Sequence, residues 1–158
     1  MAITKILVPY DKSDHAKEAL AEAIKVIGDN PNATIHVLEV QAPPHDLVFS
    51  AMNPQEFGSH KPVVEKETFL ENVNERAAAA TEALQAEVLP QTEGFPGKVI
   101  AETVFAIYVV DTIVDAAKSD EADMIAMGSR GIGAIRGMIG SISYGVLRAA
   151  TVPVLVVH

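Results

Sequence analysis

Five short apolar runs alternate along the chain with longer segments in which apolar residues recur every three or four positions. The short runs predict β-strands, and the periodic segments predict amphipathic helices. Strands that are separated by helices need crossover connections, which place them in a parallel sheet covered by helices on both faces. The sequence therefore predicts one α/β domain over residues 1–158 with a five-stranded parallel sheet. The predicted strands are residues 3–8, 34–40, 98–104, 123–127 and 151–157.

The first predicted helix has signals at both of its ends. Asp11 and Ser13 are alternative caps at its start, and Gly28 stops it. Between these ends a single apolar stripe faces the predicted core. The stripe consists of Ala16, Ala19, Leu20, Ala23, Ile24 and Ile27.

The other helices are predicted over residues 64–89, 111–118 and 141–150, and Pro90 closes the longest of them. An apolar stretch extends the third predicted strand as far as Tyr108. The residues that follow the second strand, 41–62, are rich in Pro, His, Asn and Ser and have no sustained period. They predict a long mobile loop.

Composition excludes several classes of protein. Aromatic residues make up only 5% of the 158 residues and Trp is absent, so the core is expected to consist of Ala, Val, Ile and Leu. Cysteine is also absent, which excludes disulfides, thiolate metal sites and cysteine nucleophiles. The first residues lack the layout of a signal peptide, and no apolar run approaches the roughly 18 residues that cross a bilayer. The chain is therefore predicted to be cytoplasmic, with no membrane partner.

Charge is distributed unevenly along the chain. The net charge of −9 argues against nucleic acid as a partner, because phosphate backbones need a basic face. Residues 124–158 contain three arginines and no Asp or Glu, so this segment carries +3 and residues 1–123 carry −12. A locally basic end can hold a small anion. The alternative is that this segment is core strand, loop and helix with few charges.

The most informative segment lies between the fourth predicted strand and the last predicted helix. Glycines 128, 131, 133, 137 and 140 fall within thirteen residues there. Glycine lets backbone N–H groups approach an anion without a Cβ in the way, and Gly140 and Ser141 stand where the helix begins, at the positive end of its dipole. With the hydroxyls of Ser141 and Ser143 they form a candidate phosphate cradle. Tight turns before a helix are the purely structural alternative.

The segment matches neither of the common glycine-rich phosphate signatures. No Gly-Lys-Ser/Thr occurs anywhere, and the segment after the first strand reads VPYDKSD rather than the dinucleotide fingerprint. Its order instead resembles the C-terminal signature of the universal stress protein family, a Gly-x-x-Gly followed by Gly-Ser or Gly-Thr. The start VPYDKSDHAKEAL resembles the family's Val-Pro-x-Asp-x-Ser block, and TVPVLVV resembles its closing strand.

The resemblance spans the whole chain and implies a Rossmann-like, adenine nucleotide alpha hydrolase-like fold that binds ATP, ADP or AMP. It implies that Pro9, Tyr10 and Asp11 contact the adenosine and that Val37 touches the base. It also implies that the glycine segment surrounds the phosphates, through Gly128, Ser129, Arg130, Gly131, Gly140, Ser141, Ile142 and Ser143. Any Mg²⁺ is expected to be held chiefly by the phosphates of bound ATP.

The chain departs from the family pattern at two places. Eight residues separate Gly131 from Gly140, one fewer than the usual nine. The missing residue shortens the loop by at most about 3.5 Å, so we expect terminal phosphates to be held less well than adenosine and ATP to gain little over ADP or AMP. The family's Gly-Asp-Pro after the third strand is replaced by Ile107, Tyr108 and Val109, which extend the strand or cover an interface.

The remaining candidate residues keep open alternatives. Asp11 is a helix cap, a ribose hydroxyl acceptor or a ligand beside a metal ion, and Arg130 and Arg136 either neutralise phosphates or are solvated. The histidines at 15, 36, 45, 60 and 158 show no metal-ligand spacing, and His36 is expected to be a packed residue of a strand. No Gly-x-Ser-x-Gly elbow or placed carboxylate pair is visible, so no catalytic residue and no protein metal site are predicted.

The sequence is thus interpreted as a nucleotide-binding regulatory protein of the universal stress type, active as a homodimer through its C-terminal strand. Two alternatives remain open. One is a branch of the same fold that binds no nucleotide and acts as an interaction module. The other is slow ATP hydrolysis, for which no base is identified.

Overall fold

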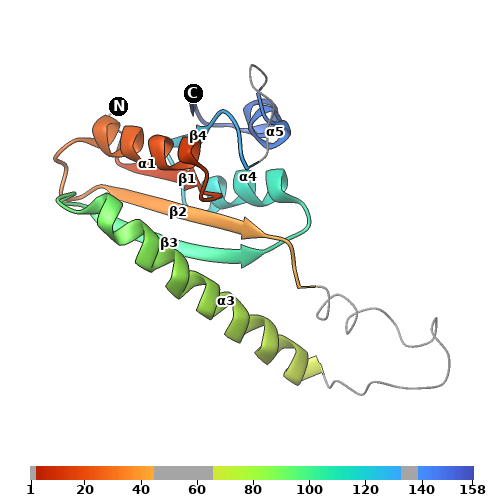
Figure 1. Cartoon of the computed structure of the whole chain (residues 1–158). Helices are drawn as coiled ribbons and strands as arrows, with labels where there is room; N and C mark the ends of the chain where they lie inside the picture. The colour runs from red at the N-terminus through yellow and green to blue at the C-terminus, as the bar shows by residue number, and fades with distance from the viewer. Residues whose placement is uncertain (1–2, 45–65, 133–138) are drawn as a thin grey trace, which may run out of the picture.

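The computed structural model describes residues 3–44, 66–132 and 139–158, with residues 66–70 described by their backbone alone. These residues form one sheet in the order β3-β2-β1-β4-β5, and every neighbouring pair is parallel (Figure 1). The predicted fold class is confirmed. The strands are β1 (Lys5–Pro9), β2 (Thr34–Gln41), β3 (Lys98–Phe105), β4 (Met124–Gly128) and β5 (Val154–Val157).

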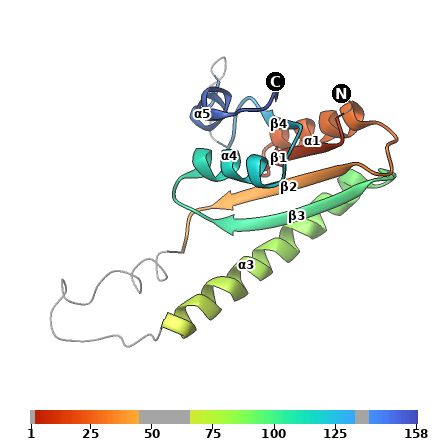
Figure 2. The same ribbon diagram turned by 180° about the vertical axis from the view of Figure 1, so that it is seen from behind.

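The helices lie on both faces of this sheet, as predicted. The described α-helices are α1 (Asp14–Ile27), α3 (Lys66–Val88), α4 (Val109–Ser119) and α5 (Ser141–Ala149). On one face α1 lies over β1 and β4 while α3 runs along β3, and on the other face α4 and α5 pack together (Figures 1 and 2). Within β1, Ile6 and Val8 join the core with α1 and α3, whereas Leu7 joins the core with α4 and α5. Burial on both faces explains why the strands are almost wholly apolar.

The hydrogen bonds at the start of α1 show which residue caps this helix. The Ser13 hydroxyl accepts the Ala16 N–H at 3.2 Å, so Ser13 is the N-cap and Asp11 is not. Gly28 ends the helix with φ +64° and donates its N–H to the Ile24 carbonyl. The predicted apolar stripe is confirmed, and its buried members are Ala16, Ala19, Leu20, Ala23 and Ile27.

The structure confirms the predicted end of the long helix and corrects the predicted end of the third strand. Pro90 does close the long helix, because α3 passes after Val88 into the 3-10 turn η2 (Leu89–Thr92), which carries Pro90 at its start. The prediction that the third strand reaches Tyr108 is wrong. The last ladder bond runs from the Ala106 N–H to the Gln41 carbonyl, where β2 also ends, and Tyr108 is instead the N-cap of α4.

The loop predicted over residues 41–62 falls mostly on residues 45–65, which lie outside the described residues. The described part begins with Gln41, which is the last residue of β2.

Strand order fixes where a ligand can bind in this fold. The chain passes from β1 outward to β2 and β3, and then returns to the other side of β1 to form β4 and β5. The order reverses between β1 and β4, and the crevice at the carboxyl ends of the strands beside such a reversal is the usual ligand site. Residues 9–11 and 128–131 stand at this position.

Candidate functional site

A cavity of about 640 Å³ opens at the carboxyl ends of β1 and β4. Its volume lies within the roughly 300–1,000 Å³ that is usual for small-molecule sites. All the predicted site residues except Val37 and Ser129 line it. The lining members of that set are Pro9, Tyr10, Asp11, Gly128, Arg130, Gly131, Gly140, Ser141, Ile142 and Ser143.

One wall of the cavity is apolar and was not identified from the sequence. Leu38 and Val40 reach it from β2, while Val109 and Ile113 reach it from α4. Alternation along β2 explains why Leu38 lines the cavity and Val37 does not: Val37 is fully buried on the opposite face, against α1 and α3. Further apolar lining residues that the sequence analysis did not name are Ala16, Met127, Ile132 and Ile139.

Ser129 is also placed away from the cavity lining. It is 1% exposed, its N–H donates to the Val157 carbonyl at 2.6 Å, and its carbonyl accepts the Gly140 N–H at 2.8 Å. Its buried hydroxyl has no hydrogen-bond partner in the described part of the chain. Ser129 therefore joins the end of β4 to β5 and to the start of α5.

Tyr10 lines the cavity, but its side chain belongs to the core on the α3 side. The Tyr10 hydroxyl donates to Glu87 Oε1 at 3.0 Å and accepts from Gln91 Nε2 at 3.0 Å. Burial, and then the neighbouring Glu87 carboxylate, raise the pKa of Tyr10 to about 12, although the hydrogen bond from Gln91 acts in the opposite direction. Tyr10 thus links the end of β1 to α3 and remains a neutral phenol.

The Asp11 carboxylate bridges two strand ends. Its Oδ1 accepts the Ser13 N–H at 3.1 Å, and its Oδ2 accepts the Ile132 N–H at 3.1 Å. A Cβ on Gly131 would lie 2.3 Å from Oδ2, so the absence of a side chain at Gly131 makes room for this carboxylate. The end of β1 and the glycine segment after β4 are therefore in direct contact.

Gly128 is a glycine for a different reason. A Cβ there would lie 2.7 Å from the Cβ of His15 and 2.8 Å from its carbonyl carbon, so α1 packs directly onto the end of β4. The Gly128 carbonyl accepts a hydrogen bond from the buried Ser143 hydroxyl at 2.9 Å. The prediction that this hydroxyl is a donor for a ligand is therefore wrong, because the hydrogen bond is already made inside the protein.

The start of α5 supplies the remaining polar groups. Gly140 is its N-cap, and its N–H donates to the Ser129 carbonyl, so this part of the predicted phosphate cradle is wrong: the Gly140 N–H is already used inside the protein. The first turn of a helix has N–H groups with no intrahelical acceptor, and here these belong to Ser141, Ile142 and Ser143. All three residues line the cavity. The positive end of the helix dipole therefore faces it.

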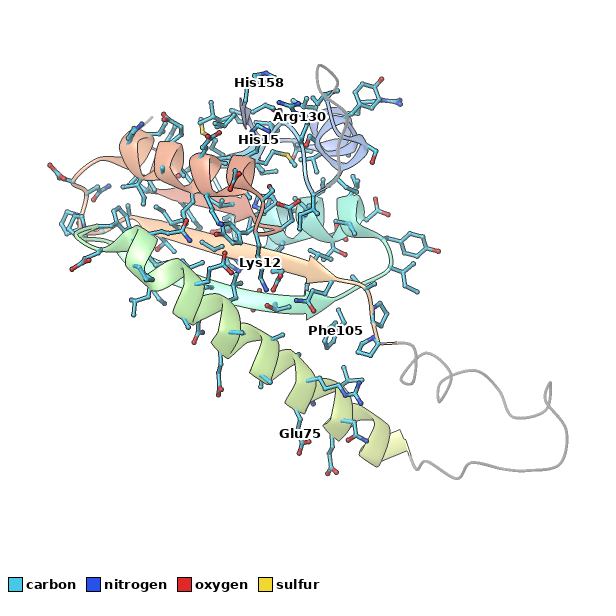
Figure 3. The ribbon with its side chains drawn as sticks, viewed as in Figure 1. Lys12, His15, Glu75, Phe105, Arg130 and His158 are labelled. Atoms are coloured by element: carbon cyan, nitrogen blue, oxygen red, sulfur yellow. The ribbon has the colours of Figure 1, made fainter. Side chains whose placement is uncertain are left out.

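Arg130 and Lys12 are cations close to Asp11 or the glycine segment in the sequence, and they differ in their partners. Arg130 is half-buried, lines the cavity and forms no ion pair within the described residues. Lys12 reaches from the end of β1 to β2, where its Nζ lies 3.0 Å from Oε1 of the buried Glu39 (Figure 3). Lys12 has a left-handed φ of +67°, so the ion pair anchors an unusual turn directly after Asp11. Arg136 lies outside the described residues, as do Gly133 and Gly137.

The histidines that the structure describes do not join the site as ligands. His36 is buried in β2, as predicted, with Nε2 3.2 Å from Glu102 and Nδ1 facing Asp120. Among the described residues no group of three or more His, Asp or Glu side chains could hold a metal ion. In the same part of the chain, no helix is long and apolar enough to cross a membrane.

The fold and the site together define a doubly wound α/β protein with a ligand-sized cavity at its switch point. The model of the universal stress protein family matches residues 2–158, and the chain belongs to this family. A universal stress protein encoded in the QAH/OAS sulfhydrylase 3′ region of Thermus aquaticus is 31% identical over 154 residues, which cover 97% of each chain.

Solved structures share the architecture. The universal stress protein UspA from Lactobacillus plantarum is similar with a TM-score of 0.68 and 26% identity, over 100% of this chain and 99% of that one. A universal stress protein family protein from Arabidopsis thaliana with AMP bound has a TM-score of 0.59 and 18% identity, over 98% and 90% of the two chains. The similarity to the Arabidopsis thaliana protein is one of fold alone.

Proposed function

We propose that this chain is a regulatory protein of the stress response that binds an adenine nucleotide in the cavity between β1 and β4. One observation carries the proposal: the cavity joins an apolar wall to the glycine segment and the open N-terminus of α5. An apolar slot suits a planar base, and helix N–H groups suit a phosphate. The AMP-bound relative of the same fold supports this assignment.

Each part of the nucleotide has matching groups in the cavity. The adenine ring lies against Leu38, Val40 and Ile113, and a ribose hydroxyl donates to the Asp11 carboxylate. The phosphate accepts the N–H groups of Ser141–Ser143 and pairs with Arg130. When ATP is bound, Mg²⁺ is carried by its phosphates.

The charge of the cavity favours few phosphates. Arg130 is the only cationic side chain among the described lining residues, and Asp11 is an anion on the same rim. One guanidinium compensates the charge of one phosphate group far better than that of three. We therefore assign AMP as the preferred ligand, with ADP and ATP bound no more tightly.

The decisive experiment is to release and identify the ligand. Protein purified without added nucleotide is denatured, and the supernatant is separated by ion-exchange chromatography. We expect an adenine nucleotide, and calorimetry on the emptied protein should show AMP binding at least as tightly as ATP. Protein that neither releases a nucleotide nor binds one by calorimetry would instead be an interaction module of the same fold.

A further inference from the structure

Lys12, in the turn between β1 and α1, has a backbone conformation that suits glycine and not lysine. Its φ is +67°. In this left-handed region the Cβ of an L-residue comes close to the following carbonyl oxygen, so only glycine visits it routinely. Another residue stays there only when contacts elsewhere in the fold hold it. The turn after β1 therefore depends on a contact made by Lys12.

The Lys12 side chain finds that contact in β2. Its Nζ lies 3.0 Å from Oε1 of Glu39, which is only 6% exposed. The other oxygen of Glu39, Oε2, accepts the hydroxyl of the buried Thr103 in β3 at 2.9 Å. Thr103 is itself fixed, because its N–H donates to Thr81 Oγ1 of α3 at 2.9 Å. The Glu39 carboxylate is thus a rigid partner for the ammonium group, attached to two strands and a helix.

The turn that Lys12 forms is also part of the rim of the cavity. Tyr10, on one side of Asp11, is held toward α3 by its hydroxyl, and Lys12, on the other side, is held by Glu39. Asp11 lies between them and accepts the Ile132 N–H. Because α1 is fixed by its packing, a change of φ at Lys12 would move the peptide between Asp11 and Lys12. The contact between the end of β1 and the glycine segment would move with it.

We propose that Glu39 is a positioning residue of the cavity: its ion pair with Lys12 stabilises the left-handed turn and so keeps the end of β1 against the glycine segment. Neither Glu39 nor Lys12 is among the described residues that line the cavity, so both act through the backbone of the turn. The inference rests on the proposed function, since the cavity that the turn shapes is the proposed nucleotide site.

The test compares Lys12→Ala with Lys12→Gly. Both variants remove the ammonium group and leave the same carboxylate without it, and they differ only in the Cβ. Glycine adopts positive φ about as readily as negative φ, so about half of the Lys12→Gly turns stay competent and the affinity for AMP should fall by only about twofold. Alanine avoids positive φ, so Lys12→Ala should bind AMP at least about fivefold more weakly than Lys12→Gly.

Two further variants control for charge. Lys17→Ala removes the same charge from an exposed position of α1 outside the cavity lining, and it should leave the affinity within about twofold. Glu39→Gln keeps the shape of the side chain and an oxygen for Thr103. It should weaken AMP binding by about fivefold in the native chain but by less than about twofold in Lys12→Gly, because a glycine turn no longer needs the ion pair. Calorimetry measures each affinity.

Hydrogen exchange tests the same turn without nucleotide. The Ile132 amide should exchange faster in Lys12→Ala than in Lys12→Gly. The Lys98 amide, which donates to the Ala33 carbonyl at the opposite end of the sheet, should exchange at the same rate in both. Equal Ile132 exchange in the two variants, or an equal loss of affinity from Glu39→Gln with and without Lys12→Gly, overturns the proposal. If the native chain binds no adenine nucleotide, the proposed function fails, and Ile132 exchange alone then decides whether Glu39 and Lys12 position the turn.

Discussion

At the scale of single residues, Gly128 at the end of β4 and Gly131 just after it make room for different neighbours. Gly128 admits the backbone of α1 at His15, whereas Gly131 admits the Asp11 carboxylate. Neither glycine has a positive φ, so the close approach of a neighbour, and not backbone conformation, explains both. The distinction matters because main chain inside a packed helix cannot move aside, while an exposed side chain can rotate.

Substitution should separate these two roles. Gly128→Ala should lower the free energy of unfolding by about 1–3 kcal/mol, because the added methyl overpacks the contact between α1 and β4. Gly131→Ala should cost less than about 0.5 kcal/mol, as is usual for an exposed position. Gly131→Val should fold but lose nucleotide affinity, because its branched side chain fills the rim of the cavity. Urea unfolding and calorimetry measure these effects, and equal losses of stability at the two positions would contradict the assignment.

At the scale of elements, the starts of β1 and β4 are tied together by one carboxylate. Asp123, just before β4, accepts the Thr4 N–H at 2.8 Å and the Lys5 N–H at 3.0 Å. These two backbone hydrogen bonds are the main cause of a pKa of Asp123 that lies below its usual 3.8. The Asp123 N–H in turn donates to the Lys5 carbonyl, so the contact is reciprocal.

This contact should make the protein sensitive to acid. Because the pKa of Asp123 is lower in the folded chain than in the unfolded chain, its stabilisation is complete above that usual value and is lost as the pH falls through the folded value. Asp123→Asn should therefore be less stable than the native chain at neutral pH, and the difference should shrink below about pH 4. The control is Asp29→Asn, an exposed position after α1. Urea unfolding across this range would contradict the prediction if both variants showed the same pH dependence.

The elements themselves were predictable because strands buried on both faces leave uninterrupted apolar runs. The ends of these elements were harder to predict. Ile107 and Tyr108 are as apolar as a strand, yet each is 72% exposed, because β2 ends at Gln41 and offers no further ladder partner. Periodicity could not show which face of β2 borders the cavity. The structure places Leu38 on that face and Val37 on the opposite one. The sequence likewise could not show that the Gly140 N–H donates to Ser129, because only folding brings these two residues together.

At the scale of the whole molecule, β5 forms one edge of the sheet. In the described structure β5 pairs with β4 on one side only, and all four of its residues are half-buried. The carbonyls of Pro153 and Val157 accept bonds from β4 and Ser129, so alternation turns the N–H groups of Val154 and Val156 to the open edge. An open apolar edge favours pairing with a second copy of the chain, which supports the proposed homodimer.

Proline can test this edge without breaking the sheet. Val156→Pro removes an outward N–H and leaves the bonds to β4 in place, so it should convert a dimer into a monomer. Val156→Ala keeps the N–H and should remain a dimer. Light scattering at micromolar concentration distinguishes the two masses. A native chain that is already monomeric, or a Val156→Pro variant that stays dimeric, would exclude β5 as the interface.

The position of Ser129 connects this edge to the cavity. Its N–H donates to the last residue of β5 and its carbonyl accepts the N–H of Gly140, the N-cap of α5, so Ser129 contacts both the proposed interface and the proposed phosphate site. If a ligand rearranges the start of α5, we expect the two backbone hydrogen bonds of Ser129 to carry that change to β5. Thermodynamic linkage then makes the effect reciprocal. If the ligand changes the self-association constant by some factor, self-association changes the affinity for the ligand by the same factor. The measured affinity would then depend on the concentration of the protein itself.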